Sequence, residues 1–350
     1  MDPLVSILIP AYNAEKWIEQ TMASAINQTY SNTEVIVIDD GSSDKTLQIA
    51  KRFESSKVKV IAQENAGGAA ARNTALAHAQ GEYMQWLDHD DLLAAEKVSE
   101  QMRQVRSIAD DRFLISGNFG SFYFCPDRAR MITGPLGRDL SPLDYFFTKF
   151  EQDEWMHTTC WLVSRELTQK AGPWLDLRSP DDDGEYFCRV VAASAGISFV
   201  PTAKSYWRIG NKASFSYRRE DSVASLRAML ESSRRCIAHF RALEDSDRSR
   251  KACVTFLRNR LIYYYPQHRE MLSEIYALAE ELGGALSVPP LLPQYEIIRA
   301  LFGWEVAKRA RDLIGSSKQQ LSRFFDKIIQ NFSRTSSGHR LPYLGKLMTR

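Results

Sequence analysis

Residues 34–44 have the sequence EVIVIDDGSSD, in which an unbroken apolar run ends in a polar turn. A short continuous apolar run bounded by turn residues is typical of a strand that is buried on both faces. Three more apolar runs and three helix-like stretches alternate with it along the first hundred residues, at 5–9, 14–29, 44–53, 57–61, 69–79 and 83–87. This alternation predicts an α/β fold, with a Rossmann-like, mostly parallel central sheet and helices on both faces.

Polar residues follow each of the four apolar runs, at 10–13, 39–44, 63–68 and 88–91. In an open α/β sheet, ligands bind outside the carboxyl ends of the strands. We therefore expect these four loops to converge on one binding site.

The rest of the chain divides into two parts. Residues 110–215 mix expected strands with one helix, at 113–115, 119–124, 161–164, 184–195, 197–201 and 203–208. From residue 216 the pattern is helical, with a break where prolines cluster near residue 290. We predict a catalytic domain over 1–215, with halves of about 1–110 and 111–215, and a helical extension over 216–350.

Composition excludes several classes of protein. The chain of 350 residues has 44% hydrophobic and 11% aromatic residues, so it is not mainly disordered. With 45 basic and 43 acidic residues its net charge is +2, which argues against nucleic acid as a partner. Its five cysteines form no CxxC pair, and the sequence has no signal-peptide pattern or spanning apolar stretch. We therefore expect a cytoplasmic protein.

Asp88 and Asp90 follow an apolar run and are separated by His89. Two carboxylates at this spacing can face one ligand, and oxygen ligands suit a divalent cation such as Mn²⁺ or Mg²⁺. The alternative is a solvated acidic turn in front of a helix that begins near Leu92. The position at the predicted binding edge favours the metal site.

Gly67 and Gly68 precede an alanine-rich stretch that contains Arg72. Such a sequence can place a helix N-terminus and one cation beside a diphosphate, or it can be a flexible turn with Arg72 on the surface. The sequence contains neither GxGxxG after its first strand nor GxxxxGK[ST], which removes the main support for dinucleotide redox chemistry and P-loop phosphoryl transfer.

Taken together, these motifs resemble glycosyltransferase family 2, nucleotide-sugar enzymes with the GT-A fold. The resemblance covers about residues 1–210 and lies in five motifs that stand in the family's order and spacing, at 5–13, 34–44, 65–73, 81–83 and 87–91. It implies transfer of a sugar, with inversion, from a nucleoside diphosphate sugar to an acceptor hydroxyl in cell-surface polysaccharide or glycolipid assembly. We expect a UDP-sugar donor and a saccharide or lipid-linked acceptor.

The resemblance also implies roles for single residues. Tyr12 and Asp40 would contact a uracil-type base, and Arg72 would contact the nucleotide. Asp88 would contact the ribose or the metal, and Asp90 would bind the metal. The predicted nucleotide-sugar site comprises Pro10, Tyr12, Asp40, Gly67, Arg72, Asp88 and His89.

An acidic pair, Asp182 and Asp183, stands shortly before Arg189, as in many inverting members of the family. The resemblance implies that Asp183 is the general base, although either aspartate could simply cap a helix. Four further residues are weaker candidates for the acceptor pocket, namely His157, Trp161, Asp182 and Glu185. Tryptophans are more often core residues, and Glu185 could equally face solvent.

Residues 321–332 carry an apolar stripe at helical spacing, and residues 296–350 contain eleven basic and four acidic residues. The stripe could pack on the catalytic domain, or it could lie on an anionic membrane surface as a peripheral contact.

Two other functions remain open from the sequence alone. One is a nucleotidyl- or phospho-transferase that uses the same acidic edge. The other is a non-catalytic nucleotide-sugar-binding module, which would bind the donor without turning it over.

Overall fold

The computed structural model describes residues 2–179, 181–210, 222–289, 291, 293–311 and 313–314. Its strands are β1 (Val5–Ala11), β2 (Thr33–Asp40), β3 (Val58–Gln63), β4 (Tyr83–Trp86), β5 (Leu92–Leu93), β6 (Phe113–Phe122), β7 (Arg130–Ile132), β8 (Leu162–Ser164) and β9 (Gly196–Arg208). Its helices are α1 (Ile18–Ile26), α2 (Thr46–Lys51), α3 (Gly68–His78), α4 (Lys97–Ile108), α5 (Pro142–Gln152), α6 (Arg165–Ala171), α7 (Asp182–Ala193), α8 (Val223–Leu243), α9 (Asp247–Tyr264), α10 (Arg269–Glu281) and α11 (Pro293–Phe302). Two short 3-10 turns are η1 (Pro126–Arg128) and η2 (Thr158–Cys160).

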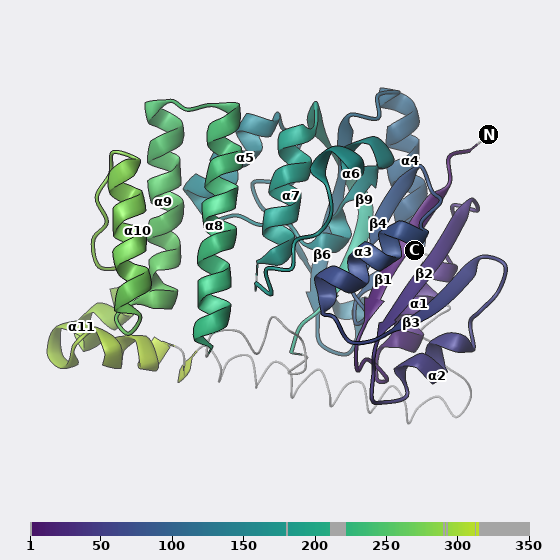
Figure 1. Cartoon of the computed structure of the whole chain (residues 1–350), viewed down its shortest axis with the longest axis horizontal. Helices are drawn as coiled ribbons and strands as arrows, with labels where there is room; N and C mark the ends of the chain where they lie inside the picture. The colour runs from purple at the N-terminus through teal and green to yellow at the C-terminus, as the bar shows by residue number, and fades with distance from the viewer. Residues whose placement is uncertain are drawn as a thin grey trace.

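The strands form one mixed sheet in the order β3-β2-β1-β4-β8-β6-β9-β5, with β7 paired to β6 (Figure 1). β1, β2, β3 and β4 are mutually parallel, so their carboxyl ends lie along one edge of the sheet. Beyond β4, the antiparallel strand β8 leads to the parallel pair β6 and β9. The predicted α/β sheet, with helices on both faces, is confirmed.

Alternate residues of β1 face opposite layers of the protein. Ile7 and Ile9 pack with α1, α2 and α4, whereas Leu8 packs with α3, α5 and α7. This period-2 alternation of wholly apolar residues is what a strand covered on both faces requires.

In two places, the structure has one long strand where the sequence predicts two short ones. Residues 113–122 form β6 and residues 196–208 form β9, and the two strands pair along their length with an irregularity between Gly117 and Asn118. A β-carbon on Gly117 would lie 2.4 Å from the carbonyl oxygen of Ala203, so only glycine allows the strands to approach here.

The segment after the acidic turn also differs from the prediction. Leu92 and Leu93 do not begin a helix but form β5, which pairs with β9, and α4 starts at Lys97. Tertiary pairing with a strand more than a hundred residues away therefore overrides the local pattern.

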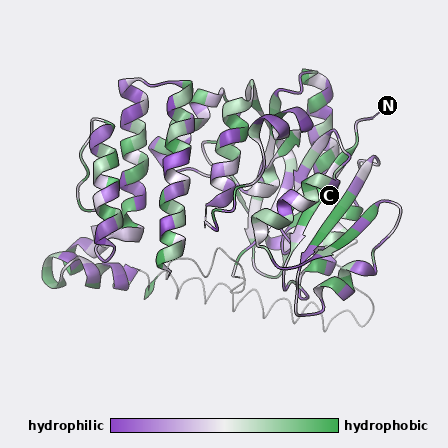
Figure 2. Ribbon diagram, viewed as in Figure 1, coloured by the Kyte–Doolittle hydropathy of each residue, from purple (hydrophilic) through white to green (hydrophobic). Residues whose placement is uncertain are grey.

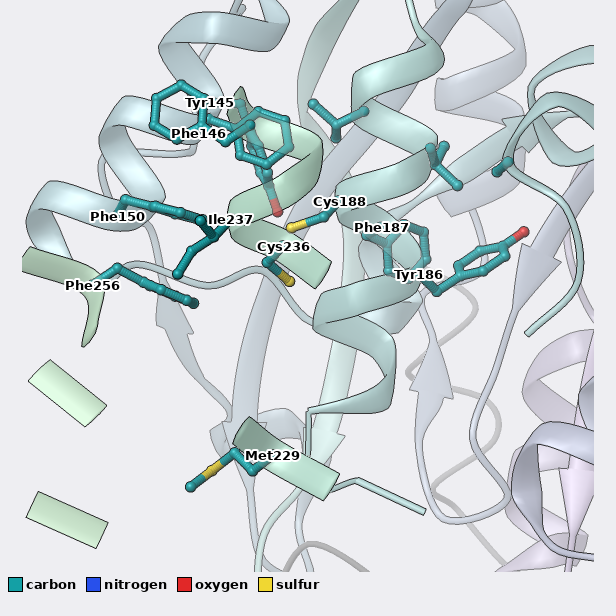
Figure 3. Packing of buried hydrophobic residues seen from close by; sticks show 14 of the residues in the cluster. Tyr145, Phe146, Phe150, Tyr186, Phe187, Cys188, Met229, Cys236, Ile237 and Phe256 are labelled. Atoms are coloured by element: carbon teal, nitrogen blue, oxygen red, sulfur yellow. The ribbon is translucent and has the colours of Figure 1, made fainter. Parts of the chain in front are cut away.

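The helices after β9 share the core of the sheet region. Phe240 of α8 stacks on Phe146 with ring centroids 5.0 Å apart. Phe256 of α9 stacks on Phe150 at 4.0 Å (Figure 3). One buried cluster runs from Leu8 of β1 to Leu282 after α10. The proposed division at residue 215 stays a prediction, but the packing between its two parts is that of a continuous core.

α11 lies across the end of α9 and α10, at the far side of the molecule from the sheet (Figure 1). Trp304 and Tyr295 pack there beside Tyr265. Apolar and polar residues mix along this helix, whereas the central strands are almost wholly apolar (Figure 2). The predicted stripe at 321–332 lies outside the described residues. Among the residues that are described, no helix is both long enough and apolar enough to cross a membrane.

Candidate active site

The loop after β2 and the loop after β3 contact each other at the carboxyl edge of the sheet. Gly41 has a φ of 69°, and a β-carbon there would lie 2.8 Å from the amide nitrogen of Asn65. Asn65 in turn donates its side-chain amide to the carbonyl oxygen of Asp40 over 2.8 Å. The Asp-Gly-Ser turn is thus fixed by a close backbone contact that only glycine permits.

Asp40 holds the loop that leads into α3. Its carboxylate accepts hydrogen bonds from the Gln63 side chain at 2.7 Å, from the Ala66 amide at 3.0 Å and from the Gly67 amide at 2.8 Å. Both oxygens are therefore engaged within the protein, and the base contact expected from the sequence stays a prediction for this residue.

Asp39 has an oxygen that lacks a partner. Its Oδ2 accepts from the Ser42 amide at 3.2 Å, but its buried Oδ1 makes no hydrogen bond. A buried carboxylate oxygen without a donor is costly unless a ligand supplies one. Asp39 pairs in register with Ala11, and the following residue, Tyr12, is 47% exposed. The sequence interpretation missed this open acceptor.

Arg72 is not a surface residue. Its guanidinium donates to Asp88 and to Asp182, each over 3.0 Å, and its Cζ lies 4.4 Å from the centroid of the Trp174 ring. Burial opposes the charge, but Asp182 and Asp88 outweigh burial and raise the pKa of Arg72. The arginine therefore stays charged and ties the acidic turn after β4 to the start of α7.

Gly67 precedes α3 with a φ of 93°, a conformation that favours glycine. His89 follows β4, with its Nδ1 3.3 Å from the carbonyl oxygen of Pro10. The first and fourth strands are thus connected at their ends.

The acidic turn after β4 is half-buried at Asp88 and His89 and buried at Asp90 and Asp91. Asp90 is 8% exposed and Asp91 is 1% exposed. Arg208 of β9 donates from its backbone to Asp91 Oδ1 at 2.7 Å, and its Nε donates to the carbonyl oxygen of Asp90 at 2.7 Å. Burial, together with the charges of Asp90 and Asp88, raises the pKa of Asp91 well above its usual value.

Asp88, Asp91 and His157 each offer one ligand atom, and these atoms lie within 4.8 Å of one another. His157 Nε2 is 3.4 Å from Asp91 Oδ2, which forms no hydrogen bond. Burial lowers the pKa of His157, so its imidazole is neutral and able to bind a metal. The two carboxylates suit the divalent cation expected from the sequence, but the group contains Asp91 and an imidazole and does not include Asp90.

Asp183 faces the same region from α7. Thr158 donates its hydroxyl to Asp183 Oδ2 over 2.9 Å, and the other oxygen accepts from the Gly184 amide at 2.9 Å. The N-cap residue of α7 is Asp181, whose side chain pairs with Arg260 at 2.8 Å. Asp182 and Asp183 thus lie inside the first turn rather than at the N-cap position, and each accepts one first-turn amide.

Two of the weaker acceptor candidates lie in the interior. Trp161 is 1% exposed and stacks on Phe187 at a centroid distance of 5.2 Å. Glu185 is also 1% exposed, and it accepts from Arg189 Nε at 2.9 Å. Trp161 thus fills the core and Glu185 neutralises a half-buried arginine rather than facing solvent, while their roles toward an acceptor stay predictions.

Comparison with known proteins identifies relatives of this chain. Residues 6–171 match Glycosyl transferase family 2. The chain is 46% identical over 102 residues to the UDP-Glc:alpha-D-GlcNAc-diphosphoundecaprenol beta-1,3-glucosyltransferase WfgD of Escherichia coli, covering 29% of this chain and 40% of that protein. It is 45% identical over 103 residues to an uncharacterized glycosyltransferase of Haemophilus influenzae, covering 29% of this chain and 41% of that protein. The chain thus spans less than half the length of these curated relatives.

Among solved structures, S. aureus TarS residues 1–349 in complex with UDP-GlcNAc has a TM-score of 0.63 and 19% sequence identity. The alignment covers 80% of this chain and 82% of that chain, and it shows a shared fold. Residues 6–171 therefore form a domain that matches glycosyltransferase family 2, and the chain shares the fold of the GT-A glycosyltransferase TarS.

Proposed function

We propose that this protein transfers a sugar from a nucleoside diphosphate sugar to an acceptor hydroxyl, with inversion at the anomeric carbon. The observation that carries the proposal is the double ion pair of Arg72, because it joins the acidic turn expected at the diphosphate to the helix that carries the candidate base. A nucleotidyl-transferase would use the acidic turn but would leave Asp183 unexplained.

The donor is a UDP-sugar in this proposal. WfgD is described as acting on UDP-Glc, and TarS has been solved with UDP-GlcNAc. In this chain, the open oxygen of Asp39 would accept the N–H of the uracil ring, and Tyr12 would lie along the base. Asp40 and Gly67 would shape the loop on the diphosphate side. This proposal assigns the base contact to Asp39, whereas the sequence analysis expected it at Asp40.

Asp88 and Asp90 would hold Mn²⁺ or Mg²⁺, and Asp91 and His157 offer further ligand atoms within 4.8 Å of that of Asp88. When bound, such a cation offsets the charge that develops on the leaving diphosphate. Asp91 would stabilise the turn, since its Oδ1 accepts a hydrogen bond from the backbone amide of Arg208.

Asp183 would act as the general base. As the acceptor oxygen attacks the anomeric carbon, its proton passes to a carboxylate oxygen of Asp183, and the bond to the diphosphate oxygen breaks with its electron pair. Thr158 orients this carboxylate by donating to Oδ2. One displacement with a single carboxylate on the acceptor side gives inversion.

The test is a panel of nucleotide sugars scored for hydrolysis, with and without Mn²⁺ or Mg²⁺. We expect one UDP-sugar to be turned over only with the cation. A protein that binds UDP-sugars but hydrolyses none under any condition would be a binding module, and release of nucleoside monophosphate would indicate a nucleotidyl- or phospho-transferase.

We also propose peripheral contact of the helical extension with a membrane, which suits a glycolipid or lipid-linked acceptor. Ile297, Leu301 and Phe302 of α11 are 69%, 70% and 66% exposed. Residues 293–311 contain four basic and two acidic residues. Exposed apolar side chains with a basic excess are typical of helices that lie in a bilayer surface.

A further inference from the structure

A cluster of four rings lies next to the candidate base. Trp155, His157, Phe119 of β6 and Trp207 of β9 contact one another, with ring centroids between 5.3 and 6.2 Å apart. His157 and Phe119 are buried, at 6% and 4% exposure, whereas Trp155 is 44% exposed. The cluster thus has a buried side and one indole that faces solvent.

The chain fixes Trp155 close to the reacting groups. Thr158, three residues further on, donates to Asp183, and His157 lies 3.4 Å from Asp91. Thr159 bonds to Ser205 of β9 at 2.9 Å, and the Gln85 side chain donates to the Thr159 carbonyl at 3.0 Å. The segment is therefore held on both sides, and the position of the exposed indole relative to Asp183 is set by the fold.

Conventional core packing does not account for this side chain. A tryptophan that is 44% exposed loses much of the burial that normally stabilises it, yet its ring is held edge-on against Trp207 at a centroid distance of 5.3 Å. Rigid, exposed aromatic faces are typical of binding surfaces.

We propose that Trp155 is a stacking platform for a pyranose ring of the acceptor. The inference rests on the proposed transfer reaction and names the chemistry of its second substrate. A pyranose presents C–H groups on its face and hydroxyls at its edge, so an indole can pack against the face while nearby carboxylates accept from the edge. The carboxylates bound to the same segment, Asp183 at Thr158 and Asp91 near His157, disfavour a phosphate there. The sugar to be extended would thus lie on Trp155, with its reacting hydroxyl toward Asp183.

The first measurement follows the Trp155 indole N–H in ¹⁵N-tryptophan-labelled protein, assigned by its absence from Trp155→Phe. Methyl β-glucopyranoside, methyl β-galactopyranoside and methyl N-acetyl-β-glucosaminide are the probes, and sorbitol is the open-chain control. We expect at least one glycoside to shift this resonance, and neither sorbitol nor UDP to do so. If no glycoside shifts it while UDP still binds, the platform is wrong.

The second measurement is kinetic, with the same glycosides as acceptors for the donor that the hydrolysis panel identifies. Trp155→Leu should raise the KM for the glycoside roughly tenfold, the size expected for losing a stacked ring, while the affinity for UDP is kept. Trp155→Phe keeps an aromatic ring, so its KM for the glycoside should be close to that of the wild type. Tyr263→Leu, an exposed ring of α9, is the matched control and should leave transfer unchanged.

These outcomes separate the platform from the proposed function. If Trp155→Leu binds UDP, hydrolyses the donor and has an unchanged KM for the glycoside, the platform is wrong. The proposed transferase function would still stand. A glycoside shift at Trp155 in a protein that hydrolyses no donor would support the platform and overturn the transferase.

Discussion

Arg72 and Asp182 are 110 residues apart in the sequence, and Arg72 Nη1 donates to Asp182 Oδ2 over 3.0 Å. The other terminal nitrogen of the same guanidinium donates to Asp88. One buried cation thus fixes the spacing between the proposed donor site and the proposed base. A guanidinium suits this role because its planar fork can serve two carboxylates at once.

Replacement of Asp183 by asparagine tests the base. The amide can still accept the Thr158 hydroxyl, but it cannot take a proton. Transfer should fall by roughly 10²- to 10⁴-fold, with the affinity for UDP and the melting temperature close to wild type. Asp245→Asn makes the same change in a surface ion pair between α8 and α9 and should be neutral. Near-normal transfer by Asp183→Asn would remove this residue from the mechanism.

Asp90→Asn and Asp91→Asn separate the metal ligand from the residue that supports the turn. Titration with Mn²⁺ should show a large loss of affinity in Asp90→Asn, and chelation should abolish transfer by the wild type. In Asp91→Asn we expect mainly a lower melting temperature, because Asp91 accepts from the backbone of Arg208. If Asp91→Asn is the variant that loses Mn²⁺, the ion lies instead within the group of Asp88, Asp91 and His157.

The strands and the binding edge could be predicted from the sequence, because apolar runs that end in polar turns report local structure directly. The sequence could not show which of Asp39 and Asp40 has an oxygen open to a ligand. Neighbouring residues of a strand point to opposite faces, and only the tertiary structure shows that the loop before α3 occupies one of them.

The two tryptophans of residues 155–161 show the same limit. Both stand in one short, mixed segment, yet Trp161 is buried in the core and Trp155 is exposed. Their environments depend on α7 and on β9, which contribute Phe187 and Trp207 from later in the chain. The presence of β9 in the fold was predictable, but its pairing with β5 was not, since Leu92 and Leu93 look locally like the start of a helix.

Asp39→Asn should weaken the affinity for UDP about tenfold, because the amide replaces a charged acceptor with a neutral one. Asp40→Asn should instead lower the melting temperature, since one of the two oxygens that accept from Gln63, Ala66 and Gly67 is replaced by a donor. Isothermal titration with UDP and thermal unfolding of both variants decide between the two aspartates. Equal loss of UDP affinity in both variants would contradict the assignment to Asp39.

Lys97 should make stability depend on pH. It is fully buried between Gln85 and Gln101, with Cys160 nearby, and burial lowers its pKa to about 7. Between pH 7 and its unfolded value of about 10.5, the unfolded chain binds the extra proton, so the free energy of unfolding rises with pH. The wild type should gain on the order of 4 kcal/mol over this window, and Lys97→Met should show a flatter profile. Urea titrations at several pH values measure both slopes, and equal slopes would contradict a neutral buried lysine.

Membrane contact by α11 is tested with Leu301→Asp, because this side chain is 70% exposed and its replacement removes no core packing. The wild type should float with anionic liposomes at low salt, and Leu301→Asp should stay in the soluble fraction with an unchanged melting temperature. Val223→Asp, at a single exposed apolar residue of α8, is the matched control and should still float. A fall in melting temperature by Leu301→Asp alone, without flotation of the wild type, would mean that this face is covered by another part of the protein itself. Flotation of the wild type that persists in Leu301→Asp would place the membrane contact outside α11.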